Sequence, residues 1–253
     1  MSDERPAPRD WDAATYDRVA DPMTRWGAAV VGRLPLRGDE TVLDAGCGSG
    51  RVTELLLERL PNGRVVALDR SPAMIDQARI RLARFGDRIE YVVADLGDPL
   101  PLSGPLEAIL STATFHWVPD HDALFRNLAA VLRPGGRLVA QCGGAGNIAS
   151  VRGVLATIGD GWLGASHYET PEATTERLAA AGFEDVECWL TEEPTDFAPG
   201  EPFETYLRTV ILGAHLARLP EGERDAFVRL VAERLPAPRI DYVRLNILAR
   251  RAR

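Results

Sequence analysis

A glycine-rich turn with an acidic residue in front of it is the part of this chain whose residue types could hold a ligand. The sequence D-A-G-C-G-S-G occupies residues 44–50, directly after a short apolar run. Glycines at alternate positions permit a tight turn and let the backbone approach a ligand closely, because no Cβ intervenes. A helix predicted from Arg51 would direct its N-terminal amide groups to the same place, which favours an anionic group such as a carboxylate or phosphate.

Two further acidic residues follow the next two apolar runs. Asp69 ends V-V-A-L-D, about 20 residues beyond Gly50, and an acid at that spacing can accept hydrogen bonds from a ribose diol. Asp95 ends the run that starts at Ile89, and its carboxylate can accept a hydrogen bond from an exocyclic amine. The three acids therefore predict a ligand with several distinct parts.

The glycine turn differs from the dinucleotide-binding pattern G-x-G-x-x-G. Arg51 stands where the third glycine of that pattern would fall, and Asp44 suits a positively charged amino group better than a pyrophosphate. A ribose, an amine-bearing base and an ammonium–carboxylate tail together describe S-adenosylmethionine. A nicotinamide-dependent oxidoreductase stays open as an alternative at this point.

Strand and helix patterns alternate along the chain and would bring these residues together. Repeated units of this kind predict an α/β fold, a doubly wound and mostly parallel sheet, in which ligands bind beyond the carboxyl ends of the strands. We expect strands at 42–43, 65–68, 89–94, 106–111, 138–141, 186–191 and 240–249, and helices at 51–60, 71–82, 122–132 and from 170 to 182. A turn is expected at Pro134-Gly135-Gly136.

The remaining segments are expected to form a single domain together with this sheet. Residues 1–9 are polar and predicted to be disordered, and residues 10–34 are predicted to form N-terminal helices over the cofactor. Residues 202–235 carry two helical patterns separated by Pro220. We interpret them as a helical cap insertion that forms a lid or a wall of the substrate site.

Composition narrows the functional class. The 253-residue chain has a net charge of −8 and a pI of about 5.1, which argues against nucleic acid and acidic membranes as partners. It contains no lysine, so lysine-based covalent chemistry is excluded. Three separated cysteines predict neither a disulfide framework nor a metal site. Without a secretory signal or an apolar run of about 18 residues, we expect a cytoplasmic monomer or homodimer.

The successive motifs V-L-D-A-G-C-G-S-G, V-V-A-L-D, A-D-L, F-H-W-V and L-R-P-G-G-R-L resemble those of class I S-adenosylmethionine-dependent methyltransferases. Within that superfamily, F-H-W-V-P-D-H and the C-terminal layout resemble the trans-aconitate methyltransferase group. The resemblance implies a Rossmann-like seven-stranded sheet whose last two strands form an antiparallel hairpin. It also implies methyl transfer from S-adenosyl-L-methionine, with S-adenosyl-L-homocysteine as product, to a small-molecule substrate. A non-catalytic cofactor-binding protein or partner subunit is the alternative of a different class.

The resemblance also implies roles for individual residues. The methionine end of the cofactor would lie against Gly46, Gly48 and their neighbours, with Asp44 acting through the amino group or through ordered water. Asp69 would bind the ribose. The other cofactor-binding residues implied are Arg70, Met74, Asp95 and Leu96 around the adenine, Thr112 at the amino-acid end, and Tyr16 and Arg25 from the N-terminal helices.

His116 is the candidate catalytic residue. It comes just after the fourth strand, and its titration range suits a general base; a structural histidine is the alternative reading. It stands where related proteins tend to carry Gln, and the acceptor stays open among a carboxylate, a hydroxyl and a carbon nucleophile. His167, Tyr168 and Tyr206 are candidate substrate contacts.

Overall fold

The computed structural model describes residues 21–102 and 104–253. The segment predicted to be disordered, 1–9, lies outside the described residues. Tyr16 and the first part of the predicted N-terminal helices also lie outside them.

The core of the fold is a seven-stranded sheet with the order β3-β2-β1-β4-β5-β9-β6. Five strands run parallel: β1 (Thr41–Ala45), β2 (Arg64–Asp69), β3 (Ile89–Val93), β4 (Leu106–Thr112) and β5 (Leu132–Gly143). The last strand, β9 (Val243–Arg251), lies between β5 and β6 (Phe183–Glu192) and runs antiparallel to both. The predicted fold class is confirmed.

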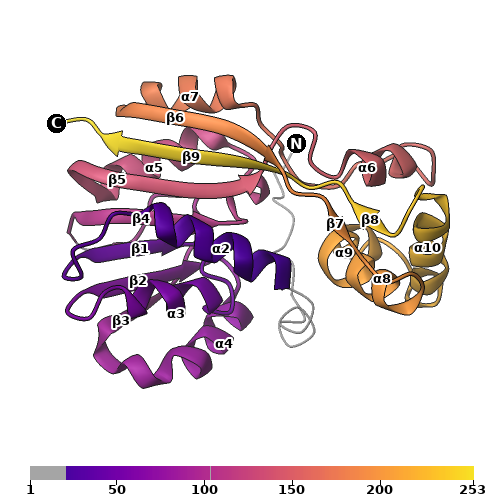
Figure 1. Ribbon diagram of the computed structural model, residues 1–253, viewed down its shortest axis with the longest axis horizontal. Helices are drawn as coiled ribbons and strands as arrows, with labels where there is room; N and C mark the ends of the chain where they lie inside the picture. The colour runs from indigo at the N-terminus through magenta and orange to yellow at the C-terminus, as the bar shows by residue number, and fades with distance from the viewer. Residues whose placement is uncertain (1–20, 103) are drawn as a thin grey trace, which may run out of the picture.

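Alternation along the strands buries both faces of the sheet. Val42 packs on one side against α2 (Asp21–Arg33), α3 (Arg51–Glu58) and α4 (Pro72–Leu82). The adjacent Leu43 packs on the other side with residues of α5 (His121–Val131) and α7 (Pro171–Ala180). Figure 1 shows these two helical layers in front of and behind the sheet. Strands that are covered on both faces have continuous apolar sequences, and the strand segments of this chain show such runs.

Side-chain caps start three of the helices. Ser71 and Thr170 accept hydrogen bonds from the backbone N–H groups of Met74 and Ala173, at 3.3 and 3.2 Å, and a proline follows each cap. Asp120 caps α5 in the same way, at 2.8 Å from Ala123 N. The helix starts predicted at Ser71 and Thr170 are therefore confirmed.

Two local predictions were wrong. The turn expected at 134–136 lies inside β5, which starts at Leu132 directly after α5. Gly135 has a positive φ of 74° inside the strand. The pairing of β4 with β5 shifts register in this part of β5, between Leu106 and Ala108 of β4. The strand expected over 240–249 is divided, because β8 (Arg239–Ile240) pairs with β7 (Thr195–Asp196) in a separate small sheet.

Residues 202–235 lie in a helical lobe beside the sheet, which we call the cap (Figure 1). It contains α6 (Ala149–Leu155), α8 (Glu201–Tyr206), the π-helical η3 (Leu207–Ile211), α9 (Gly213–Leu216) and α10 (Glu221–Arg234). The cap has its own hydrophobic core, and Trp26 of α2 and Tyr242 before β9 belong to it. No helix within the described ranges combines the length and apolar character needed to cross a membrane.

Candidate active site

The strand order places a topological switch point between β1 and β4. The chain runs from β1 outward to β2 and β3 and then crosses back to β4 on the other side of β1. The connections at the carboxyl ends of β1 and β4 therefore leave in opposite directions, and such switch points are where open α/β sheets bind ligands.

The glycine turn lies at this switch point. The backbone N–H groups of Gly46 and Cys47 both donate to the Leu68 carbonyl, at 2.8 and 2.9 Å. Gly46 has a φ of 86°, and a Cβ on it would lie 2.2 Å from Oγ1 of Thr114, so the position requires glycine. A Cβ on Gly48 would meet open space. The turn is packed on one side and open on the other, as a ligand-binding turn must be.

Asp44, directly before the turn, is fully buried. Its Oδ2 accepts a hydrogen bond from the Thr53 hydroxyl at 2.6 Å, while its Oδ1 has no hydrogen-bond partner among the described residues. Burial raises the pKa of Asp44 to about 7; the Thr53 hydrogen bond opposes this shift, and the charge of Asp69 adds to it. A buried carboxylate oxygen without a partner is unfavourable, so the site favours an arriving cation.

Asp69 is held in place by two backbone groups. Its Oδ2 accepts from Gly48 N and its Oδ1 from Ser71 N, both at 2.9 Å. Burial raises the pKa of Asp69, opposed by these two hydrogen bonds and by the neighbouring charge of Arg70. Each carboxylate oxygen keeps a second lone pair. The fixed side chain can therefore accept two further hydrogen bonds, which is what a ribose diol offers.

The predicted adenine contacts lie around the ends of β2 and β3. Asp95 is partly buried and accepts a hydrogen bond from Gly97 N at 2.9 Å. Leu96 and Met74 are buried, the latter on α4, while Arg70 is partly exposed at the end of β2.

The end of β4 contributes one predicted residue and two that sequence reasoning missed. Thr112 is the last residue of the strand and is partly buried. The next residue, Ala113, has a positive φ of 55°, a conformation that non-glycine residues hold only where the surroundings enforce it. Here its N–H donates to the Gln141 carbonyl at 2.7 Å. The hydroxyl of Thr114 lies 3.2 Å from the Gly46 carbonyl and 2.9 Å from that of Thr112.

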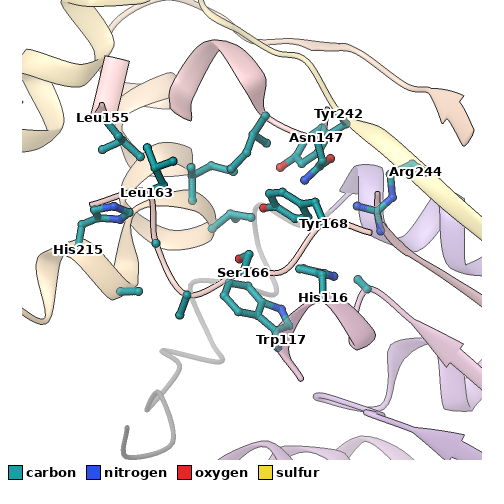
Figure 2. Close-up of a pocket in the computed structure, with 17 residues that line it drawn as sticks. His116, Trp117, Asn147, Leu155, Leu163, Ser166, Tyr168, His215, Tyr242 and Arg244 are labelled. Atoms are coloured by element: carbon teal, nitrogen blue, oxygen red, sulfur yellow. The ribbon is translucent and has the colours of Figure 1, made fainter. Parts of the chain in front are cut away.

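A pocket opens beside this switch point, between the carboxyl edge of the sheet and the cap. Figure 2 shows His116 and Arg244 on its sheet side and Leu155, Leu163 and His215 on its cap side, with Tyr168 between them. The described lining contains arginine, histidine, asparagine, serine and aromatic side chains but no aspartate or glutamate. In a chain of net charge −8, a pocket with a buried arginine and no acidic side chain in its described lining favours an anion over a cation.

His116 is buried in this pocket and oriented by the end of β5. The backbone N–H of Gly143 donates to its Nδ1 at 3.3 Å, so Nδ1 is an acceptor and the neutral ring carries its proton on Nε2. Burial, with the positive charges of Arg244 and His121, holds the pKa of His116 well below its usual value. The ring is neutral near pH 7 and presents an N–H donor.

Arg244 is the permanently charged side chain of the described pocket lining. It is the second residue of β9, and because β9 is antiparallel its start meets the carboxyl ends of the parallel strands. Its backbone pairs with Gly143, the residue that orients His116. The guanidinium lies 4.6 Å from the Trp26 ring centroid, a cation–π contact, and only 2% of Arg244 is exposed.

The three predicted substrate residues have different positions. Tyr168 lines the pocket, 5.8 Å from His116 between ring centroids. His167 is exposed, and its backbone N–H donates to the His116 carbonyl at 2.8 Å. Tyr206 is buried in the core of the cap, with its hydroxyl 2.5 Å from that of Tyr242.

The two residues predicted to close the cofactor site from the N-terminal helices remain predictions. Tyr16 is outside the described residues. Arg25 is on α2, largely exposed, with an ion pair to Glu193 at 3.4 Å.

Sequence reasoning gives Arg244, with Arg152 and Arg208, as a candidate partner of an acidic acceptor but favours a surface or packing role for all three, and it missed Asn147. The signal for Arg244 was present: in V-R-L-N-I-L-A, arginine and asparagine alternate with the apolar residues of a strand with two covered faces. Asn147 sits in a glycine-rich loop with no such pattern. Its Oδ1 accepts from Val243 N at 2.9 Å, which leaves its amide N–H₂ as the donor.

Comparison with known proteins decides the family. Residues 42–136 match the model of a methyltransferase domain. A trans-aconitate 2-methyltransferase of Methylobacterium radiotolerans is 34% identical over 96% of this chain and 99% of its own length. One from Azoarcus is 32% identical over 93% and 94% of the two chains. The chain belongs to the class I S-adenosylmethionine-dependent methyltransferases, in the trans-aconitate 2-methyltransferase group.

Solved structures show the same fold at low identity. Phosphoethanolamine N-methyltransferase 2 of Haemonchus contortus, bound to S-adenosylhomocysteine, has a TM-score of 0.65 at 19% identity, covering 95% of this chain and 56% of its own. Geranyl diphosphate methyltransferase with S-adenosylmethionine has a TM-score of 0.58 at 18% identity, covering 98% and 93%. The methyltransferase family excludes the nicotinamide-dependent alternative, and the enzyme uses S-adenosylmethionine.

The residues of this methyltransferase fit its cofactor. The unpartnered Oδ1 of Asp44 is a site for a cation, the open side of Gly48 leaves room for close approach, and Asp69 has acceptor capacity for a diol. Along the carboxyl edge of the sheet, Asp44 and Gly48 lie at the end of β1, and Asp69 lies at the end of the neighbouring β2. The pocket with Arg244 is next to this edge on the β4 side.

Proposed function

We propose that this methyltransferase transfers the methyl group to a carboxylate oxygen of a small organic acid, forming a methyl ester. The observation that carries the proposal is the pocket itself: a buried arginine, Arg244, and neutral donors, with no acidic side chain among the described lining residues. The names of the relatives, trans-aconitate 2-methyltransferases, also describe enzymes that act on an acid.

Three donors can hold the acceptor carboxylate. The guanidinium of Arg244 supplies charge and a planar set of N–H groups that matches a carboxylate. The Nε2–H of His116 and the amide N–H₂ of Asn147 are neutral donors, each fixed by a backbone contact at its other end. Because these groups are oriented before the acceptor arrives, little reorganisation is needed on binding.

We propose the following cofactor contacts. Asp44 binds the amino group, Asp69 the ribose hydroxyls and Asp95 the adenine amine, with Gly46, Gly48 and Thr112 beside the methionine moiety. Arg70, Met74 and Leu96 flank the adenine, and Tyr16 and Arg25 close the site. The unpartnered Asp44 Oδ1 and the two fixed oxygens of Asp69 support the first two assignments.

The cofactor, when bound, supplies a methyl group on a positively charged sulfur, which a nucleophile can take by in-line displacement. A carboxylate at pH 7 is already a nucleophile, so no proton has to be removed and no general base is required. The protein's contribution is to bind, orient and desolvate the acceptor. Well-oriented reactants can lower a barrier by about 7–11 kcal/mol.

His116 therefore has a different proposed role from the general base considered from sequence. Its Nδ1 lone pair already accepts from Gly143, and its lowered pKa makes it a weak base. We assign it to hydrogen bonding with the acceptor carboxylate. Gln offers the same kind of N–H donor, so His116→Gln should keep most of the activity that His116→Leu loses.

The test is an assay with labelled cofactor and a panel of acids, phenols and amines, followed by brief alkaline treatment of the product. A methyl ester releases labelled methanol in alkali, whereas a methyl ether, an N-methyl or a C-methyl product does not. Alkali-labile label on a carboxylic acid is the expected result. Alkali-stable label on a phenol or an amine, with acids inactive, would refute the carboxylate assignment.

Arg244→Gln is the matching variant, and Arg218→Gln is its control. Arg218 is a cap arginine paired with Asp160 on the surface. We expect Arg244→Gln to raise KM for the acid by about tenfold to a hundredfold, the range for a hydrogen bond to a charged group, with cofactor affinity unchanged. Equal KM in both variants, with intact folding by circular dichroism, would contradict the role of Arg244.

A further inference from the structure

We infer that the acceptor is an amphipathic monocarboxylic acid whose hydrocarbon part lies in the cap side of the pocket. The inference rests on the proposed function, because it takes the carboxylate to be held at Arg244. It departs from the trans-aconitate acceptor of the named relatives, which has three carboxylates and no hydrocarbon tail.

The two ends of the pocket differ in chemistry. Donors from the sheet edge, His116 and Arg244, form one end, and Tyr168 lies between them and the cap (Figure 2). The cap end is lined by aliphatic side chains: Leu155, Leu163, Val210, Ile211 and Ala214. Leu163 is 37% exposed, one of the large apolar side chains of the described surface that water reaches. An apolar group of the acceptor would remove this surface from water.

Among the described residues that line the cap end, none carries a permanent positive charge for a second carboxylate. Arg244 is the one permanently charged residue in the described lining. His215 lines the cap end, but burial lowers its pKa, and its Nε2 lies 3.0 Å from the Trp162 carbonyl, so the ring is neutral and its N–H is engaged.

Arg152 of α6 lies over the Tyr168 ring, 5.4 Å from its centroid, and is not itself part of the described lining. Two other arginines of the cap are engaged in ion pairs. Arg208 pairs with Asp225 and Arg218 with Asp160, each at 2.6 Å. Neither side chain belongs to the described lining. Moving a second or third carboxylate into an aliphatic pocket without a cation is strongly unfavourable. The same pocket gains free energy from each methylene of a hydrocarbon tail that it covers.

The experiment compares butyrate, hexanoate, octanoate and decanoate with trans-aconitate and citrate as acceptors of labelled methyl. We expect KM to fall about threefold to fourfold for each methylene buried, the factor that corresponds to about 0.8 kcal/mol, until the pocket is filled. The two tricarboxylates should be poor acceptors. Formation of methyl ester is verified by alkali lability, so ester chemistry and chain preference are read separately.

Ala214→Leu narrows the cap end, and Ala217→Leu is the matched control. Ala214 is the second residue of α9 and lines the pocket, whereas Ala217 directly follows the same helix and is exposed. We expect Ala214→Leu to lower kcat/KM for decanoate by about tenfold, the scale of one methylene group in a tight hydrophobic pocket. Its effect on butyrate should be smaller, and Ala217→Leu should match the parent chain.

The outcomes separate the inference from the proposed function. Ester formation on trans-aconitate with a higher kcat/KM than on every monocarboxylate would overturn the tail inference and leave the carboxylate function standing. Identical kinetics of Ala214→Leu and the parent across the series would also overturn it. Methylation of phenols or amines and of no acid would overturn both.

Discussion

Protonation of Asp44 should make cofactor binding depend on pH. The carboxyl group is fully buried, and its pKa is raised to about 7 from an ordinary value of 3.8. At about 1.4 kcal/mol per pH unit, ionising this group in the folded protein costs about 4 kcal/mol more than in the unfolded chain. The free enzyme therefore carries a protonated Asp44 below pH 7.

A cationic amino group beside Oδ1 would favour the ionised form and lower the pKa of Asp44. Cofactor binding then releases a proton below pH 7. Affinity should rise by up to about tenfold per pH unit as pH increases towards 7, and level off above that. The amino group of the cofactor stays protonated over this window, since α-amino groups titrate near 8.

The stability of the free enzyme should change in the opposite direction. The folded-state pKa of Asp44 is above its unfolded value, so between about pH 4 and 7 the folded protein binds more protons than the unfolded one. The contribution of Asp44 to stability is present below pH 4, is lost as pH rises through this window, and is constant above pH 7. Asp44→Asn removes this dependence and should stabilise the free protein at pH 7.5, by up to about 4 kcal/mol.

Titration calorimetry with S-adenosylhomocysteine, in two buffers of different ionisation enthalpy, measures both affinity and proton release. Asp44→Asn should bind more weakly above pH 7 and without pH dependence. Asp39→Asn, at an exposed position two residues before β1, is the control and should match the parent. Parent affinity that is constant from pH 5.5 to 7.5, with no proton release, would refute the reasoning about Asp44.

Three other perturbations test separate parts of the structure. Asp69→Ala should weaken cofactor affinity by about 1.5–3 kcal/mol, the scale of a charged hydrogen bond, and unchanged affinity in calorimetry would contradict the ribose assignment. Gly46→Ala places a Cβ against Thr114 at φ 86° and should abolish cofactor binding while the fold persists by circular dichroism; normal affinity would show that the turn can rearrange. Tyr206→Phe removes the hydrogen bond to Tyr242 and should lower stability by about 1 kcal/mol in denaturant titration, with cofactor affinity preserved; a loss of cofactor affinity would mean that the cap core supports the cofactor site.

The parts of the molecule with a local signal were predictable from sequence. Strands covered on both faces appear in the sequence as apolar runs. The capping pairs Ser71-Pro72 and Thr170-Pro171 predict where two of the helices start. The acids at the ends of β1, β2 and β3 could be brought together because parallel strands end at one edge. The resemblance to the methyltransferases then supplied the cofactor.

Apart from the arginine that alternates with apolar residues in V-R-L-N-I-L-A, the acceptor pocket had no comparable local signal. The pocket forms where β9, the end of β4 and the cap meet. Arg244 and His116 both contact Gly143, but they are too far apart in the sequence for a local pattern to predict this. The tautomer of His116 depends on the backbone N–H of Gly143, a contact that no sequence pattern predicts. The break between β8 and β9 also depends on pairing with β7, a residue range more than 40 positions earlier in the chain. Such features follow from tertiary contacts rather than from periodicity.

The core of the cap has a consequence for how the chain folds. Its members come from α2, α6, the segment 201–235 and Tyr242, so the cap brings together residues from near both ends of the described chain. Contacts between such distant residues form slowly. During synthesis the cap core cannot be completed until Tyr242 and β9 have been made, whereas β1 to β5 can already pair. We expect the cofactor half to become protected from hydrogen exchange first during refolding, and the cap to follow in a later phase.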